Sequence, residues 1–215
     1  MFWRSLCITT TLILTGCLHD PNTSPLLTSR SSVRPIVSVN PIITSAEHHI
    51  SWDVSSELTH IIRDRLAAHN LLYVLAEEEV ALMAHKALSR HDPFGADVSW
   101  LNKYYPQNEF VVFLDLFEHE ETPLSTAEKS PVELLMGVRV HVFDLRGAEP
   151  KIVLQEVVEQ SHHIPFQFTR SGEECVAWGD ELFSISPLGL AHEKLCQEIA
   201  SRVEDYILLH CVVAG

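Results

Sequence analysis

The stretch ELLMGVRVHVFDLRGAEPKIVLQEVVEQ, residues 133–160, decides the fold that the sequence predicts. Its first half alternates, because Arg139 and His141 stand between positions that are apolar: Leu134, Met136, Val138, Val140 and Val142. A period of two is typical of a strand with one buried face. The link at 146–150 contains a glycine, and a second strand-like run follows at 151–160. The stretch therefore predicts a β-hairpin and an antiparallel part of a sheet.

The flanking segments predict the remaining elements. Strands are expected at 33–40, 71–75 (a buried one) and 109–119. Helices are expected within 51–70 behind a cap at Ser51 or Asp53, at 77–90, briefly at 97–105, and from Ser186-Pro187 to about His210. The order β-α-β-α-(α)-β-β-β-α predicts a single α/β domain over 35–212, with a mixed sheet and the final helix packed on it.

The N-terminus predicts export and lipid attachment. Residues 1–16 have one cation and an apolar run that is too short to span a bilayer, as in a signal peptide. Leu14-Thr15-Gly16-Cys17 resembles the bacterial lipobox, in which the cysteine is acylated. An ordinary secretion signal with a chance cysteine is the alternative. Residues 17–34, rich in Ser, Thr and Pro, predict a flexible tether.

Composition and charge restrict the partners. The chain has 15 Lys and Arg against 29 Asp and Glu, and its formal net charge is −14. No basic run occurs, so nucleic acid is a poor partner. Leu18, and not Asp, follows Cys17, which in the enterobacterial sorting rule favours the outer membrane, with the domain facing the periplasm. No cofactor is expected apart from the covalent lipid on Cys17.

Three cysteines fall in the predicted domain. Cys196 and Cys211 lie at the two ends of one predicted helical stretch, about 22 Å apart at the rise of an α-helix, which is too far for a disulfide. Any disulfide would involve Cys175, and buried free thiols are an equally good interpretation.

Motifs for catalysis are weak. HEKLC at 192–196 resembles a zinc-binding helix motif, with His192 and Cys196 one turn apart and at the edge of the helix's buried face. The spacing indicates no third ligand, so no metal site is predicted. His119 and His141 are expected on the polar face of neighbouring strands, as surface histidines. No nucleophile or phosphate-loop signature occurs, so the chain is not expected to be an enzyme.

The segment 162–185 is the best candidate for a binding surface. It is long and non-periodic and carries four aromatic residues, Phe166, Phe168, Trp178 and Phe183. Long loops are often functional, and aromatic residues are enriched in interface cores. The alternative is that the rings fold back and cap the sheet.

The lipobox, the tether and the element order resemble a group of envelope lipoproteins and periplasmic modules. This group includes the curli-secretion lipoprotein CsgG, the penicillin-binding-protein activator LpoB and the N-terminal domain of TolB. The segments SSELTHIIRDRLAAHN, EFVVFLDLF, MGVRVHVFDLRGAEPKIVLQEV and LAHEKLCQEIASRVEDYIL stand where that group has comparable elements. The whole chain also resembles chlamydial lipoproteins of unknown function.

The resemblance implies a non-catalytic function in assembly or regulation, through contact with an envelope protein. Two alternatives stay open: a zinc-binding or hydrolytic periplasmic protein, and a subunit of a secretion or transport complex.

Overall fold

The structure is a computed structural model, and it describes residues 34–45, 50–169 and 171–213. The predicted signal peptide, Cys17 and the tether up to residue 33 lie outside the described residues. Contacts divide the chain into residues 1–33 and 34–215, and all described residues belong to the second unit. Among the described helices, none is long and apolar enough to cross a membrane.

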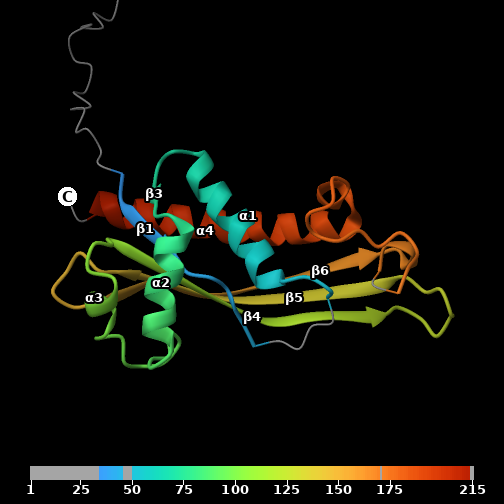
Figure 1. The fold of residues 1–215 in the computed structure, drawn as a ribbon, viewed down its shortest axis with the longest axis horizontal. Coiled ribbons are helices and arrows are strands. Elements are labelled where there is room, and N and C mark those ends of the chain that lie inside the picture. Colours follow the sequence, from blue (N-terminus) through green and yellow to red (C-terminus); the bar gives the residue numbers. More distant parts are fainter. Residues whose placement is uncertain (1–33, 46–49, 170, 214–215) are drawn as a thin grey trace, which may run out of the picture. The chain divides into compact units, whose positions relative to one another are not determined.

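One mixed sheet forms the centre of the domain (Figure 1). Its strands are β1 (Ile36–Val39), β2 (Ile43–Thr44), β3 (Tyr73–Val74), β4 (Phe110–Pro123), β5 (Val132–Asp144) and β6 (Lys151–Ile164). The order is β3-β1-β4-β5-β6, and β2 also pairs with β4. The β1, β2 and β3 pairings are parallel, whereas β4, β5 and β6 form an antiparallel meander. The predicted mixed sheet and hairpin are confirmed.

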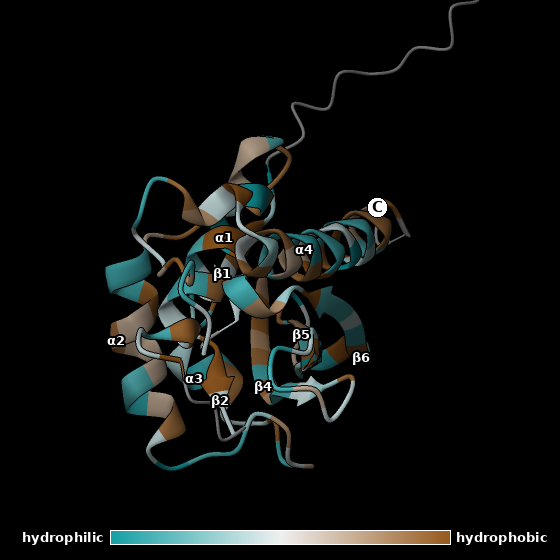
Figure 2. Cartoon of the chain, turned by 90° about the vertical axis from the view of Figure 1, so that its right-hand side faces the viewer, coloured by the Kyte–Doolittle hydropathy of each residue, from teal (hydrophilic) through white to brown (hydrophobic). Residues whose placement is uncertain are grey.

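Two helices cover one face of this sheet (Figures 1 and 2): α1 (Val54–Ala68) and α4 (Pro187–Val213). Asp53 caps α1 by accepting the Ser56 backbone N–H at 3.2 Å, and the Ser186 hydroxyl accepts the Gly189 N–H at the start of α4. The main core lies between these helices and the strands. It includes every apolar residue of the alternating set in β5: Leu134, Met136, Val138, Val140 and Val142. The final helix therefore packs on the sheet as predicted.

A second, smaller core lies on the opposite face, under α2 (Glu77–Leu88) and α3 (Leu101–Tyr104). Aromatic rings dominate it. Phe113 of β4 meets the rings of Trp100, Tyr105 and Phe143, each edge-on with centroids about 6 Å apart: 6.0, 5.9 and 6.0 Å. Edge-to-face pairs of this kind add to the stability that area burial provides. At this end of the domain the sheet is therefore covered on both faces.

Several elements differ from the prediction. The run at 71–75 is not a buried strand: β3 has two residues, and Leu71 and Tyr73 are 46% and 51% exposed. It lies at the end of the sheet order, where one side of a strand has no neighbour. The helix predicted at 97–105 shrinks to four residues, and β2 was not predicted. A two-residue strand is too short for a periodic signal.

The histidines of β4 and β5 are also placed differently from the prediction. A bulge shifts the register, so Leu116 pairs with Val138 but Glu118 pairs with Gly137. The extra residue turns His119 towards the main core, whereas His141 faces the second core. Neither is a surface residue, because both are buried. His141 Nδ1 lies 3.3 Å from the Pro93 carbonyl oxygen, and its ring packs on Phe94.

Candidate functional site

The segment between β6 and α4 is held down by a buried aromatic ring. It contains two short 3-10 helices, η1 (Phe166–Phe168) and η2 (Phe183–Ile185). Phe183 is 5% exposed, and its ring packs edge-on against Trp52 with centroids 5.6 Å apart. The first turn of α4 comes so close that a Cβ at Gly189 would lie 1.9 Å from the Phe183 carbonyl oxygen. Only glycine therefore fits there.

With Phe183 turned inwards, its neighbours Leu182 and Ile185 point outwards. They are 60% and 69% exposed, among the most exposed large apolar side chains that the structure describes. Both line an open groove of about 490 Å³, whose lining is Phe168, Glu174, Cys175, Val176, Leu182, Ile185, Ser186 and Pro187. This volume is within the range of roughly 300–1,000 Å³ that is usual for binding pockets. The groove is therefore a mostly apolar surface of binding-site size.

The four aromatic residues predicted for this surface are divided between the groove and the core. Phe168 lines the groove, but Phe166 lines a separate, smaller pocket with Glu121 and Thr169. Trp178 is half-buried against the main core, and Phe183 belongs to that core. Capping of the sheet, the alternative expectation, is thus correct for Trp178 and Phe183. The exposed apolar residues, Leu182 and Ile185, were missed because aromatic residues were given more weight than aliphatic ones.

Acidic residues lie in and next to the segment that forms the groove. Glu174 is part of its lining, and Glu173, Asp180 and Glu181 are exposed in the same segment. Residues 168–187 contain four carboxylates and a single cation, Arg170. The pKa of the Cys175 thiol is raised, first by burial and then by the negative charge of Glu121 on β4. Two different elements therefore place negative charge at the groove.

A buried polar network lies beneath this segment and joins α1, α4 and β4. The Glu57 carboxylate is fully buried, as is His192, and their Oε1 and Nδ1 atoms are 2.6 Å apart. Trp52 Nε1–H donates to the other carboxylate oxygen at 2.6 Å. The Nε2 atoms of His192 and His119 are 2.9 Å apart. A buried carboxylate is costly unless it is hydrogen-bonded, and here both of its oxygens have partners.

The HEKLC motif is placed differently from the expectation. His192 and Cys196 were expected at the edge of the buried face, but both are fully buried because α1 packs against this side of α4. His192 contacts Glu57 and His119, whereas the Cys196 thiol donates to the Leu58 carbonyl oxygen. Burial raises the pKa of Cys196 well above its ordinary value. Among the described residues, no group of three or more His, Cys, Asp or Glu is arranged to hold a metal ion.

Glu57 was missed although the sequence carries a signal for it. It stands three residues after Val54 and four before Ile61, so it falls on the apolar stripe of its helix. A charged residue on such a stripe needs a buried partner. His192 has the same position in α4, four residues after Leu188 and three before Leu195.

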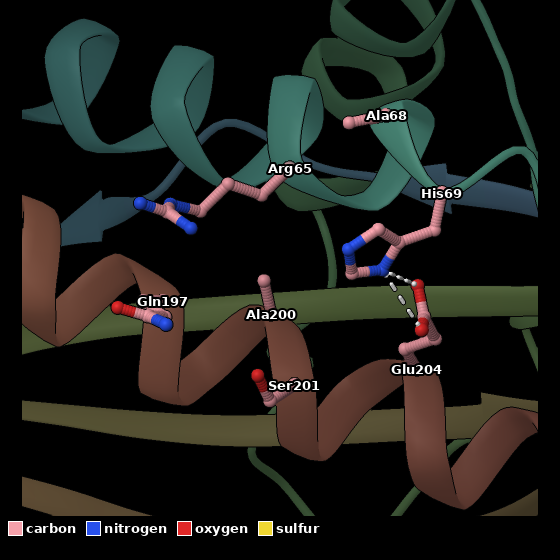
Figure 3. A pocket seen from close by; sticks show the side chains of 7 residues that line it. All are labelled: Arg65, Ala68, His69, Gln197, Ala200, Ser201 and Glu204. Carbon is pink, nitrogen blue, oxygen red and sulfur yellow. Dashed lines mark hydrogen bonds and ion pairs between the residues drawn. The ribbon is translucent and has the colours of Figure 1, made fainter.

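A further, polar pocket of about 140 Å³ lies between α1 and α4 (Figure 3). His69 Nδ1 is 3.0 Å from a Glu204 oxygen, and Arg65 pairs with Glu193. Figure 3 shows Arg65 of α1 and His69, the residue directly after α1, facing Glu204 and its neighbours on α4. The charged groups pair with each other across the two helices, so this pocket is an interhelical contact.

The cysteines at 175, 196 and 211 are free thiols. Of the two interpretations left open by the sequence, the structure shows free thiols, but the expected burial is correct for Cys196 alone of the three. Cys175 is exposed and Cys196 is buried, so they differ in access to solvent.

Comparison with known families now places the chain. Residues 26–211 match the model of DUF7499, a family of unknown function. The chain belongs to this family. No curated protein gives a significant match to this DUF7499 protein.

Solved structures give the fold. The hypothetical protein CT253 from Chlamydia trachomatis is 24% identical over 81% of this chain and 98% of that chain, with a TM-score of 0.65. The resemblance to chlamydial proteins is therefore confirmed at the level of the fold.

Solved structures with lower TM-scores include proteins that are named as lipoproteins. Lipoprotein GNA1162 from Neisseria meningitidis is 13% identical over 60% of this chain and 83% of that chain, with a TM-score of 0.42. The LpoB C-terminal domain from Salmonella enterica is 7% identical over 59% and 82%, with a TM-score of 0.38. Both TM-scores are below 0.5, too low to establish a shared fold.

Proposed function

We propose that this DUF7499 protein is a lipoprotein of the bacterial outer membrane, anchored through Cys17, which binds an envelope protein through the groove beside η2. It acts in assembly or regulation and not as a catalyst. The observation that carries the proposal is the groove itself, with Leu182 and Ile185 exposed at its wall. Contiguous exposed apolar surface is rare on monomeric proteins, and the larger patches often mark interaction sites.

The surrounding structure supports a rigid binding surface. Phe183 packs on Trp52, and Trp52 donates to Glu57, which also contacts His192. These contacts connect the groove to the core of the domain. A surface that is already ordered loses less conformational entropy when a partner binds.

The groove is tested by site-specific cross-linking in intact cells. A photoreactive residue replaces Ser184, which is exposed between the two groove residues, and the control position is the exposed Ala148 in the β5–β6 link. A discrete adduct with another protein is expected from position 184 alone. The adduct should disappear when Leu182→Ser and Ile185→Ser are added. An adduct that is insensitive to these two substitutions contradicts the proposal.

The anchor is tested separately. Metabolic labelling with an alkyne-tagged fatty acid should label the wild-type chain and leave the Cys17→Ala variant unlabelled. Equal labelling of both chains would contradict attachment at Cys17.

A further inference from the structure

The groove beside η2 combines two properties that together restrict its occupant. Its wall is apolar, with Phe168, Val176, Leu182 and Ile185 among the lining side chains. Its surroundings are acidic, as Glu174 lines it and Glu173 and Glu181 flank lining residues in the sequence. An apolar wall favours apolar side chains through the hydrophobic effect. Negative charges beside it favour a partner with positive charges.

We propose that the occupant is a protein segment whose apolar side chains are flanked by lysine or arginine. This inference rests on the proposed function and specifies the partner of that same groove. The apolar side chains would cover Leu182 and Ile185, and the cationic groups would lie over Glu173, Glu174 and Glu181.

The charge pattern argues against a bilayer surface as the occupant. Anionic headgroups attract basic segments, whereas residues 168–187 carry four carboxylates against one cation, Arg170, and the described lining of the groove includes Glu174 but no Lys or Arg. The same pattern disfavours acidic partner segments, since like charges brought together at an interface weaken binding. Negative charge also reaches the groove from outside the segment, because Glu121 of β4 acts on Cys175.

The test uses two fluorescent 15-residue peptides with identical Leu and Ile positions. One has Lys at every polar position and the other has Glu. The full chain is held in nanodiscs of zwitterionic phosphatidylcholine, and binding to empty discs is subtracted. The basic peptide is expected to bind at least tenfold more tightly than the acidic one, and its affinity should fall several-fold between 50 and 300 mM NaCl because salt screens exposed charges.

Variants assign the binding to the groove. Leu182→Ser with Ile185→Ser should weaken the basic peptide about tenfold or more, because each side chain loses apolar contact area. Leu209→Ser is the matched control: Leu209 is 57% exposed, but it lies 22 residues after the start of α4, roughly 33 Å along the helix. It should leave the affinity within twofold of wild type.

Charge variants assign the selectivity. Neutralising Glu173, Glu174 and Glu181 to Gln should weaken the basic peptide several-fold. Neutralising three exposed carboxylates elsewhere should have little effect; these are Glu78, Glu79 and Glu149. Asp180 is left intact because its carboxylate accepts the Ala177 N–H.

Four results would overturn the inference. If the basic peptide still binds the variant with Leu182→Ser and Ile185→Ser, its binding results from general charge attraction and not from the groove. Equal binding of the acidic peptide at the groove removes the charge preference but leaves the proposed function standing. If neither peptide binds but position 184 still gives a cross-link in cells, the charge preference is likewise removed and the proposed function stands. Stronger binding to phosphatidylglycerol vesicles than to the peptide, dependent on Leu182 and Ile185, makes the groove a membrane contact.

Discussion

The Glu57→Gln substitution tests whether the buried network holds α1 and α4 together. The introduced amide keeps the shape of the side chain, but its single carbonyl oxygen can accept from only one of the two donors, Trp52 Nε1–H or the His192 ring N–H. The other donor then faces an NH₂ group; for His192 that contact is favourable only in the tautomer with its proton on Nε2, which then points at His119 Nε2. Loss of a hydrogen bond to a charged group costs about 1.5–3 kcal/mol, and a buried unpaired donor costs about 1–3 kcal/mol more.

Removing the buried charge offsets part of this cost, because the carboxylate no longer has to be taken out of water. We therefore expect Glu57→Gln to lower the free energy of unfolding by about 2–4 kcal/mol. Glu193→Gln is the control, since Glu193 pairs with Arg65 while its side chain is 41% exposed. Ion pairs at that exposure contribute about 0–1 kcal/mol.

The assay is urea unfolding of the full chain in detergent, followed by tryptophan fluorescence, with the slope m compared between variants to confirm that the same transition is measured. A Trp52→Phe substitution should cost less in the Glu57→Gln background than in wild type, because the ring N–H there meets at best a neutral amide oxygen in place of the carboxylate. If Glu57→Gln and Glu193→Gln lower stability equally, or if Trp52→Phe costs the same in both backgrounds, the network does not have the structural role assigned to it.

Three further predictions use other contacts. Gly137→Ala places a Cβ 2.5 Å from the outer end of the half-buried Phe117 ring, so the ring must move, and thermal unfolding should show a loss of about 1 kcal/mol; no loss would contradict the packing. Burial lowers the pKa of His141 in the folded state, so the unfolded chain binds a proton more readily and stability falls as the pH drops below about 6.5. His141→Gln should make the stability lost between pH 7 and pH 5 smaller, and an unchanged pH profile of urea unfolding would refute this. Iodoacetamide should modify Cys175 in the native chain and Cys196 only after unfolding, as mapped by mass spectrometry; equal native rates would contradict the burial of Cys196.

Much of the fold follows from patterns that the sequence shows openly. The alternation of β5 predicted its buried face, and the Ser186-Pro187 pair marked the start of α4 because a hydroxyl and a fixed φ suit a helix N-terminus. The bulge between Leu116 and Glu118 could not be predicted, since it changes which residues share a face without changing the local composition. That one residue is why His119 lies in the core.

The candidate binding surface stays a prediction, but the structure shows which side chains of the run at 162–185 are exposed. The η2 turn directs Phe183 inwards and exposes Leu182 and Ile185 instead. Which of several apolar neighbours turns inwards depends on the shape of the core, here on Trp52 and His192. Residues so distant in the chain are brought together only by the complete fold.

The most direct test of the groove is the accessibility of Cys175 in native envelopes. Cys175 lines the groove and is exposed in the isolated domain. If a partner protein covers the groove, maleimide should label Cys175 much more slowly in native envelopes than in the purified full chain, and Leu182→Ser with Ile185→Ser should restore the rapid rate. Equal rates in envelopes and in the purified chain would show an uncovered groove and contradict a binding function at this site.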